Sequence, residues 1–276
     1  MNKGIEPAEK LFSVKDKIIA IIGSTGILGR QYVEFLSMMG ANVAMGDINR
    51  EACFSLAAEM EKKYKTAPLA YHVDISDERQ IEGYFDAIIK KYNRLDVLIN
   101  NVQTKPEGFY APFEEYKMET LSKVLAANLG GAVITCQKAC KIFLKQGYGN
   151  IINVSSTYGN VGPDQRIYEG VKNIYFPDMP FSSPVSYAIT KAGILNLTRY
   201  LASYYREKNI RVNTLSPGGV FDNHDDLFVK NYSYRTLLGR MADRNEYNGA
   251  ILFLASDASS YMTGANLIVD GGWTAI

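Results

Sequence analysis

The sequence predicts an α/β protein in which a central seven-stranded parallel sheet carries helices on both faces. Short apolar runs alternate with longer amphipathic segments along the whole chain of 276 residues. The apolar runs also lack the apolar–polar alternation of half-exposed strands, and strands buried on both faces occur mainly in parallel sheets. No linker, repeat or low-complexity tract interrupts this pattern, so residues 1–276 are expected to form one domain.

The apolar runs are the predicted strands. They are short, rich in Val, Ile and Leu, and several end in Gly or Asn, which is typical of a buried strand that leads into a turn. In chain order the seven predicted strands are 17–23, 42–47, 68–74, 95–101, 149–156, 210–218 and 266–272.

The segments between the strands carry apolar residues at helical spacing. Ser76 is a predicted N-cap and Gly40 a predicted helix end. The predicted helices are 29–40, 49–64, 76–92, 114–146, 184–207 and 245–256. Residues 157–183 follow neither pattern, and an irregular segment of that length inside a compact domain is usually functional.

The composition excludes several classes of function. Thirty basic residues balance 29 acidic ones without a basic stripe, so no nucleic-acid partner is expected. Three cysteines and two histidines are too few for a disulfide framework or a zinc site, so no metal is expected. The charged N-terminus does not resemble a signal peptide, and no run approaches the ~20 apolar residues that span a bilayer. We therefore expect a cytoplasmic protein without a membrane partner.

A glycine-rich turn follows the first predicted strand. It reads Gly23-Ser24-Thr25-Gly26-Ile27-Leu28-Gly29 and leads directly into a predicted helix. Glycines at such a turn let the backbone approach a pyrophosphate, and the helix N-terminus then offers N–H groups and a partial positive charge. Together with the strand–helix pattern, the turn predicts a Rossmann-type three-layer sandwich. The predicted dinucleotide contacts here are Gly23, Thr25, Gly26, Ile27, Leu28 and Gly29.

The second predicted strand ends at Asp47, 18 residues after Gly29. A carboxylate at this place can accept hydrogen bonds from the adenosine ribose and would repel a 2′-phosphate. No Arg or Lys stands at positions 24, 25 or 48, although Arg50 is close. NAD is therefore favoured over NADP. The alternative is that Asp47 is an ordinary solvated aspartate in a loop.

Further short motifs follow in a fixed order. They are VDIS with Asp74, INNVQ (99–103), AANLGG with Asn128, INVSS ending at Ser156, YAITK (187–191), SPG (216–218) and DGGW (270–273). In this order the chain resembles the short-chain dehydrogenase/reductase family over nearly its whole length. The resemblance implies further cofactor contacts at Ile48, Asp74, Ile75, Asn101, Tyr187, Lys191, Pro217, Gly218 and Val220.

The chain departs from the family pattern in four places. Ile22 replaces the usual threonine before the first glycine, and Gly26 gives the glycine spacing of the family's extended relatives. The usual Asn-Asn-Ala-Gly reads Asn-Asn-Val-Gln, and GGVFDNHDD lacks the threonine that commonly follows Pro-Gly. These departures affect detailed cofactor contacts more than the fold.

Two Tyr-x-x-x-Lys pairs compete for the catalytic role. A lysine one helical turn from a tyrosine can lower the phenol's pKa, so that the phenol can take a proton from an alcohol. Tyr168 with Lys172 lies 12 residues after Ser156, the more usual family separation. Tyr187 with Lys191 lies 31 residues after it but opens a long apolar-striped helix, whereas Gly170 stands inside the first pair and a stretch with two prolines follows that pair. We therefore predict Tyr187 as the catalytic acid/base.

The resemblance implies roles for the other predicted catalytic residues. Ser156 would bind the substrate oxygen, with Ser155 as the alternative assignment. Lys191 would also bind the nicotinamide ribose. Asn128 would anchor a water molecule that relays protons to Lys191. The alternative is that the Asn128 side chain forms hydrogen bonds only with the backbone.

Two segments are expected to contact the substrate. Residues 157–183 form an insertion rich in aromatic side chains, which predicts a substrate lid or, alternatively, a subunit contact. Residues 219–235 occupy the place of the family's mobile substrate loop. For His224, which lies in this segment, the two predictions are a contact with the substrate and an ordinary solvated histidine in a loop.

The sequence therefore predicts an NAD(H)-dependent enzyme that interconverts a secondary alcohol and a ketone, with a dimer or tetramer implied by the family. Within the family, the chain resembles oxidoreductases of bacterial flagellin and surface-glycan modification that supply nonulosonic acids. The segments that carry this resemblance are RIYEG, SPVSYAITKAGILN, SPGGVFDN, FVKNY and DGGWTA. That resemblance implies a sugar, sugar-phosphate or sugar-nucleotide substrate. The alternatives are a 3-oxoacyl-carrier-protein reductase and a cofactor-binding regulatory protein without turnover.

Overall fold

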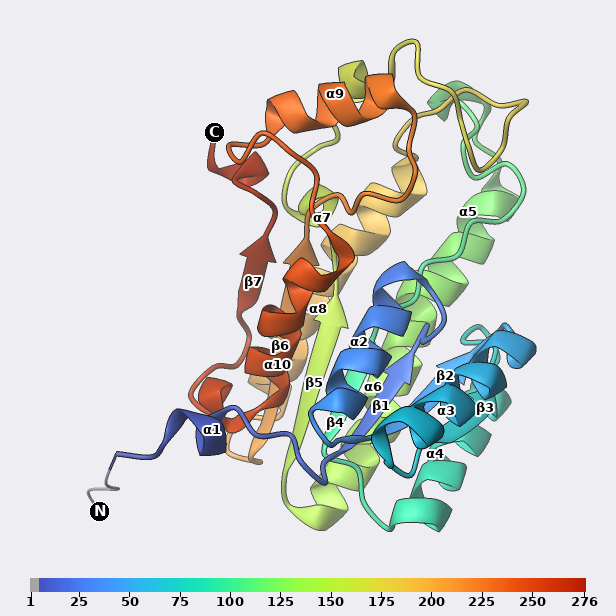
Figure 1. The fold of residues 1–276 in the computed structure, drawn as a ribbon. Coiled ribbons are helices and arrows are strands. Elements are labelled where there is room, and N and C mark those ends of the chain that lie inside the picture. The colour runs from blue at the N-terminus through green and yellow to red at the C-terminus, as the bar shows by residue number, and fades with distance from the viewer. Residues whose placement is uncertain (1–4) are drawn as a thin grey trace.

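The computed structural model describes residues 5–276 and confirms the predicted α/β architecture (Figure 1). Seven parallel strands form one sheet in the order β3-β2-β1-β4-β5-β6-β7. The strands are β1 (Ile18–Ile22), β2 (Asn42–Asp47), β3 (Leu69–His72), β4 (Val97–Asn100), β5 (Gly149–Val154), β6 (Ile210–Pro217) and β7 (Asn266–Val269).

Helices cover both faces of this sheet. One face carries α2 (Ile27–Met38), α3 (Arg50–Tyr64) and α10 (Asn248–Ala255), and the other carries α4 (Glu78–Tyr92), α6 (Gly131–Gln146) and α8 (Val185–Tyr204). The remaining helices are α1 (Ala8–Leu11), α5 (Met118–Leu125), α7 (Thr157–Asn160) and α9 (Asp226–Arg235). In the described residues, no helix combines the length and the apolar character needed to cross a membrane.

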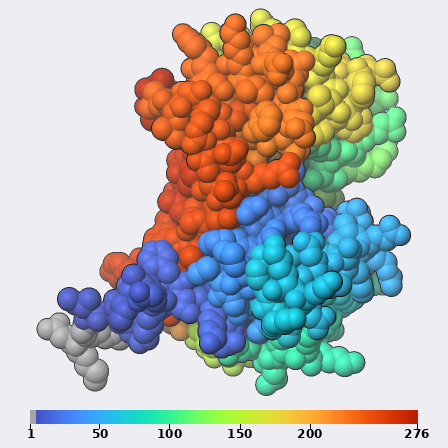
Figure 2. Space-filling model, viewed as in Figure 1, coloured from blue at the N-terminus to red at the C-terminus, as the bar shows by residue number. Residues whose placement is uncertain are grey.

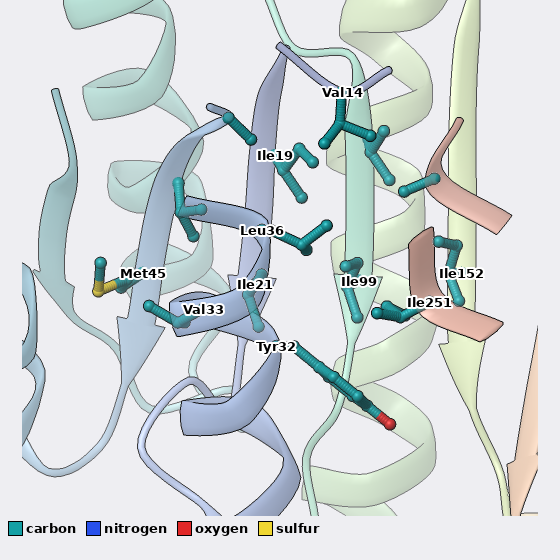
Figure 3. Packing of buried hydrophobic residues seen from close by; sticks show 14 of the residues in the cluster. Val14, Ile19, Ile21, Tyr32, Val33, Leu36, Met45, Ile99, Ile152 and Ile251 are labelled. Carbon is teal, nitrogen blue, oxygen red and sulfur yellow. The ribbon is translucent and has the colours of Figure 1, made fainter. Parts of the chain in front are cut away.

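The sheet divides the hydrophobic core into two parts, one on each face. This arrangement explains why the strands are apolar on both faces. Ile19 and Ile21 of β1 pack with Leu36 of α2 and Ile251 of α10 on one face (Figure 3). Their neighbours along the same strand point to the opposite face, toward α4 and α6. Because all five residues of β1 are buried, the strand is held by both layers at once. Full burial of each of its four isoleucines contributes ~1.5–3 kcal/mol.

Two local predictions about helices were wrong. The N-cap of α4 is Asp77, whose carboxylate accepts from the backbone of Arg79 at 2.9 Å, while Ser76 donates to Asp74 instead. An aspartate accepts such bonds with a full negative charge, which the helix N-terminus favours. The predicted helix 114–146 begins only at Met118 and is interrupted by one π-helical turn, Ala126–Gly130.

The strand order places a binding site at one end of the sheet. From β1 the chain first builds outward through β2 to β3, then returns to place β4 on the other side of β1. Ligands of open α/β sheets bind beyond the carboxyl ends of the strands at such a reversal. In Figure 1 these ends point toward α9, and in Figure 2 α9 and the 157–183 insertion stand above the rest of the molecule.

Candidate active site

A cavity of about 620 Å³ lies at the carboxyl ends of the central strands. Most residues predicted to contact the cofactor line it. These are Gly23, Thr25, Gly26, Ile27, Leu28, Asp47, Ile48, Asp74, Ile75, Asn101, Tyr187, Lys191, Pro217, Gly218 and Val220. Ser156 also lines the cavity, whereas Gly29 and Asn128 lie behind its wall.

Two glycines of the turn pack so closely against the backbone that neither has room for a side chain. Gly23 has a φ of 77°, and a Cβ on it would lie 2.6 Å from the carbonyl oxygen of Asn101. A Cβ on Gly29 would lie only 1.9 Å from the carbonyl oxygen of Gly23, so Gly29 allows α2 to start tightly against the turn. α2 has no side-chain cap at its N-terminus, which leaves its first N–H groups for an anion. The turn therefore fits a dinucleotide.

Asp47 lies beside this turn at the end of β2. Its carboxylate accepts hydrogen bonds from the backbone N–H of Thr25 at 2.8 Å and of Asn49 at 2.9 Å. Arg50 does not approach this carboxylate, because its guanidinium lies over the Phe54 ring, 5.4 Å from the centroid. The edge of the cavity next to β2 thus carries a negative charge that, among residues 5–276, has no ion-pair partner.

Tyr187 and Lys191 lie one turn apart in the first half of α8. The Lys191 ammonium is 5.8 Å from the centroid of the Tyr187 ring and donates to the carbonyl of Val154 at 3.1 Å. Burial lowers the pKa of Lys191 to about 8. Burial also raises the pKa of Tyr187, and a hydrogen bond with Ser156 opposes that rise. Burial therefore disfavours the charged form of both groups.

The structure separates the two neighbouring serines that follow β5. Ser155 is buried and donates its hydroxyl proton to the backbone carbonyl of Lys191 at 2.7 Å. The Ser156 hydroxyl oxygen accepts from the N–H of Tyr158 at 3.2 Å, and Ser156 lines the cavity together with Tyr187. Both serines line the cavity, but the Ser155 hydroxyl proton is already bonded to the backbone of α8, so Ser156 stays the predicted substrate contact.

Asn128 lies in the π-helical turn rather than in a regular helix. Its side-chain oxygen accepts from the backbone N–H of Thr104 at 2.9 Å. Within residues 5–276 its buried amide nitrogen has no hydrogen-bond partner. A buried N–H without a partner costs ~1–3 kcal/mol, so this nitrogen is well suited to hold a water molecule. Its part in a proton relay stays a prediction.

The competing pair of Tyr168 and Lys172 does not form a helix turn. Gly170 has a φ of 71° and ends the short helical segment Gln165–Tyr168. Lys172 is exposed, and the Tyr168 hydroxyl donates to that of Tyr158 at 3.2 Å. The lysine therefore has no fixed place beside the Tyr168 phenol.

An aromatic cluster closes the side of the cavity that faces the insertion. Phe181 packs edge-on against Tyr168 at 5.1 Å between ring centroids and contacts Phe228 at 5.4 Å. Phe228 belongs to α9, so the segment 219–235, expected as a loop, is helical over most of its length. The amphipathic helix forms because Phe228 and Tyr232 are buried against the insertion and Trp273.

Sequence reasoning missed several residues of this cavity. Gln103, Thr104, Lys105, Phe109 and Tyr110, which follow β4, all line it. No helical or strand periodicity marks this stretch. The departure of Gln103 from the family pattern was the one available signal.

Among residues 5–276, no group of three or more His, Cys, Asp or Glu side chains is placed to hold a metal ion. All three cysteines are buried and free.

A cradle for a dinucleotide beside a phenol and an amine is suited to hydride transfer between a nicotinamide cofactor and an alcohol or ketone. The fold and site thus define a dinucleotide-binding oxidoreductase. Residues 17–172 match the family model described as short chain dehydrogenase, and residues 178–274 match one described as enoyl-(acyl carrier protein) reductase. The chain belongs to the short-chain dehydrogenase/reductase family, as its motifs predicted.

Three similar proteins illustrate this membership. Post-translational flagellin modification protein A of Campylobacter coli is 32% identical, with 94% of this chain and 99% of the relative covered. The 3-oxoacyl-[acyl-carrier-protein] reductase of Thermotoga maritima is 31% identical, with 94% and 98% covered. The structure of a short-chain dehydrogenase from Leptospira borgpetersenii with bound NAD+ is 32% identical at a TM-score of 0.82, with 99% and 98% covered.

Proposed function

We propose that this chain is an NAD(H)-dependent oxidoreductase that interconverts a secondary alcohol and a ketone on a sugar derivative used in flagellin or surface-glycan modification. The observation that carries the proposal is the position of the Tyr187 phenol, with Ser156 and Lys191, on the wall of a cavity shared with the glycine turn. The full-length similarity to a flagellin modification protein supports the role in flagellin modification.

Each catalytic side chain has one task in this mechanism. Ser156 donates a hydrogen bond to the substrate oxygen and orients it beside Tyr187. During oxidation the Tyr187 phenolate oxygen takes the hydroxyl proton, and during reduction the phenol returns it. The Lys191 ammonium stabilises the phenolate electrostatically, and Asn128 holds a water that replenishes the proton. The nicotinamide cofactor, when bound, supplies or accepts the hydride.

The flanking segments complete the proposal. The insertion 157–183 acts as a lid, and the segment 219–235 as a mobile substrate loop. The enzyme works in the cytoplasm as a homodimer or homotetramer. Tyr200 and Tyr204 of α8 support an oligomer, because they are exposed and stacked on each other at 5.7 Å between ring centroids.

NADH is expected to raise the melting temperature more than NADPH at equal concentration, because Asp47 repels a 2′-phosphate. A hundredfold difference in affinity is worth ~2.7 kcal/mol. In a chain of this size that corresponds to ~5–10 °C, measured by thermal denaturation. Asp47→Ala should reduce the difference between the melting-temperature shifts caused by NADH and NADPH. Asp86 is exposed on α4, and Asp86→Ala should leave that difference unchanged. Equal shifts with both cofactors for the unmodified chain would contradict the Asp47 assignment.

A second candidate function is reduction of a 3-oxoacyl thioester, which the similarity to the Thermotoga maritima reductase favours. We expect NAD+-linked oxidation of at least one polyol, sugar or sugar phosphate, which is measured by the absorbance of the NADH formed. NADPH-linked reduction of acetoacetyl-coenzyme A should be at least ~10-fold slower, a gap of ~1.4 kcal/mol in the barrier. The reverse order would support the reductase, and cofactor binding without any turnover would support a regulatory protein.

A further inference from the structure

Three segments far apart in the sequence meet at the substrate side of the cavity. Lys105 follows β4, Tyr175 belongs to the insertion, and His224 precedes α9. The Lys105 ammonium lies over the Tyr175 ring, 3.4 Å from its centroid. The Tyr175 hydroxyl lies 3.4 Å from Nε2 of His224. All three residues line the cavity, so Tyr175 fixes the lysine at a wall that faces the substrate.

The charges of the cavity are unevenly distributed. Its only carboxylates, within the described part of the chain, are Asp47 and Asp74, which lie at the end predicted to hold the adenosine. On the substrate side the ionisable cationic groups are Lys105 and His224, besides Lys191 at the catalytic centre. Partial burial lowers the pKa of His224, which leaves its ring neutral at pH 7. Lys105 is therefore the one cation that this side can offer to a ligand.

Lys105 has no ion-pair partner among residues 5–276. Asp222 is the carboxylate whose charge raises the pKa of Lys105, but Asp222 already forms an ion pair with Arg244. Surrounding atoms desolvate the ammonium and lower the pKa of Lys105 to about 8, so it is still protonated at pH 7. The side chain also keeps access to solvent, so an incoming ligand can reach it. A partly desolvated cation without a counter-ion attracts an anion strongly.

Gln103 adds a second recognition group on the same wall. Its amide nitrogen donates to the carbonyl of Thr104 at 2.8 Å, which fixes the orientation of the side chain. Among the described residues, its buried amide oxygen has no partner. Because Gln103 lines the cavity and a buried acceptor without a partner is unfavourable, a ligand hydroxyl that donates to this oxygen would stabilise it. The glycine that the family usually has at this position could not do so.

We propose that Lys105 binds an anionic group of the substrate, a phosphate or a carboxylate, and that Gln103 binds one of its hydroxyls. The inference rests on the proposed function and narrows its substrate class from sugar derivatives in general to anionic, hydroxylated ones. A merely structural lysine, holding Tyr175 in place, would instead affect neutral and anionic ligands alike.

The experiment compares matched ligands on the NADH-bound protein at pH 7, so that binding is measured without turnover. Calorimetric titrations use glucose against glucose 6-phosphate and sorbitol against gluconate, with inorganic phosphate as the bare anion. We expect the anionic member of at least one pair to bind ~10-fold tighter or more to the unmodified chain, the affinity equivalent of ~1.4 kcal/mol. Glucose 6-phosphate and gluconate distinguish phosphate from carboxylate.

The variants separate charge recognition from structural effects. Lys105→Gln should abolish the anionic preference while NADH affinity is kept, and Lys105→Arg should retain part of it. Gln103→Ala should lower the affinity for the neutral and the anionic ligand of a pair by the same factor. Lys172→Gln removes an exposed lysine of the insertion outside the cavity and should change nothing.

Three outcomes would overturn the inference: equal affinity for neutral and anionic ligands, an anionic preference that survives in Lys105→Gln, or no binding of any anionic probe. These outcomes differ from a failure of the proposed function. A Lys105-dependent preference without NAD-linked turnover would refute the dehydrogenase alone. NAD-linked turnover of anionic substrates with a KM that Lys105→Gln leaves unchanged would refute the Lys105 assignment alone.

Discussion

Replacement of Tyr187 by Phe is expected to lower kcat by ~10²–10⁴-fold, the range that a positioned acid or base contributes. The substitution removes only the phenol oxygen, so the ring keeps its packing against Tyr158, which it meets edge-on at 6.4 Å between centroids. NADH affinity should therefore stay near that of the unmodified chain. Steady-state kinetics on the best substrate and a fluorescence titration with NADH measure the two effects separately.

The physical reason is the environment of the phenol. Burial disfavours both the phenolate of Tyr187 and the ammonium of Lys191, because it raises the pKa of the first and lowers that of the second to about 8. Each charged form is then stable mainly in the presence of the other. Lys191→Met should accordingly reduce kcat at neutral pH and move the rising limb of the oxidation rate to higher pH, because the phenol loses its neighbouring charge.

Tyr168→Phe is the matched control for the Tyr187 prediction. Tyr168 lines the same cavity, and its hydroxyl donates only to Tyr158 in the described structure. We expect kcat to fall by less than ~10-fold, because one neutral hydrogen bond contributes only ~0.5–1.5 kcal/mol. If Tyr168→Phe abolished turnover and Tyr187→Phe did not, the choice between the two Tyr-x-x-x-Lys pairs would be wrong.

Replacement of Gly29 by Ala is expected to destabilise the fold by ~3 kcal/mol or more and to abolish measurable NADH binding. The new methyl group would lie 1.9 Å from the carbonyl oxygen of Gly23 and 3.0 Å from the backbone of Ser24. Because both obstacles are backbone atoms, no side-chain rotation can relieve the clash, and overpacking at adaptable sites already costs ~1–3 kcal/mol. The start of α2 must move, and with it the turn that holds the pyrophosphate.

Urea denaturation and a fluorescence titration with NADH test the Gly29 prediction. Gly249→Ala is the control, because it also lies in the first turn of a helix, α10, and a Cβ there meets nothing within 4 Å. That variant should be as stable as the unmodified chain or slightly more stable, since alanine favours helix. A Gly29→Ala protein with unchanged stability and NADH affinity would show that α2 does not depend on this close approach.

Local sequence patterns sufficed for most of the architecture. Each strand shows itself by an apolar run, and a Tyr-x-x-x-Lys spacing places two side chains on one helix face without knowledge of the remaining fold. Patterns failed where local signals compete. Both Ser76 and Asp77 can cap a helix, and the π-helical turn around Asn128 leaves the apolar spacing of its helix almost unchanged. The helix α9 was missed because its apolar face is formed against the insertion.

The sequence by itself determined the family and the parallel sheet and led to the prediction of Tyr187, because these depend on residues that are neighbours along the chain. Only the tertiary structure decided that Ser155 is bonded to the backbone of Lys191, and that Lys105 lies on Tyr175 without an ion-pair partner in residues 5–276. These contacts join segments that are far apart in the chain. Their formation depends on how helices and loops pack over the carboxyl ends of the strands, which no short pattern encodes.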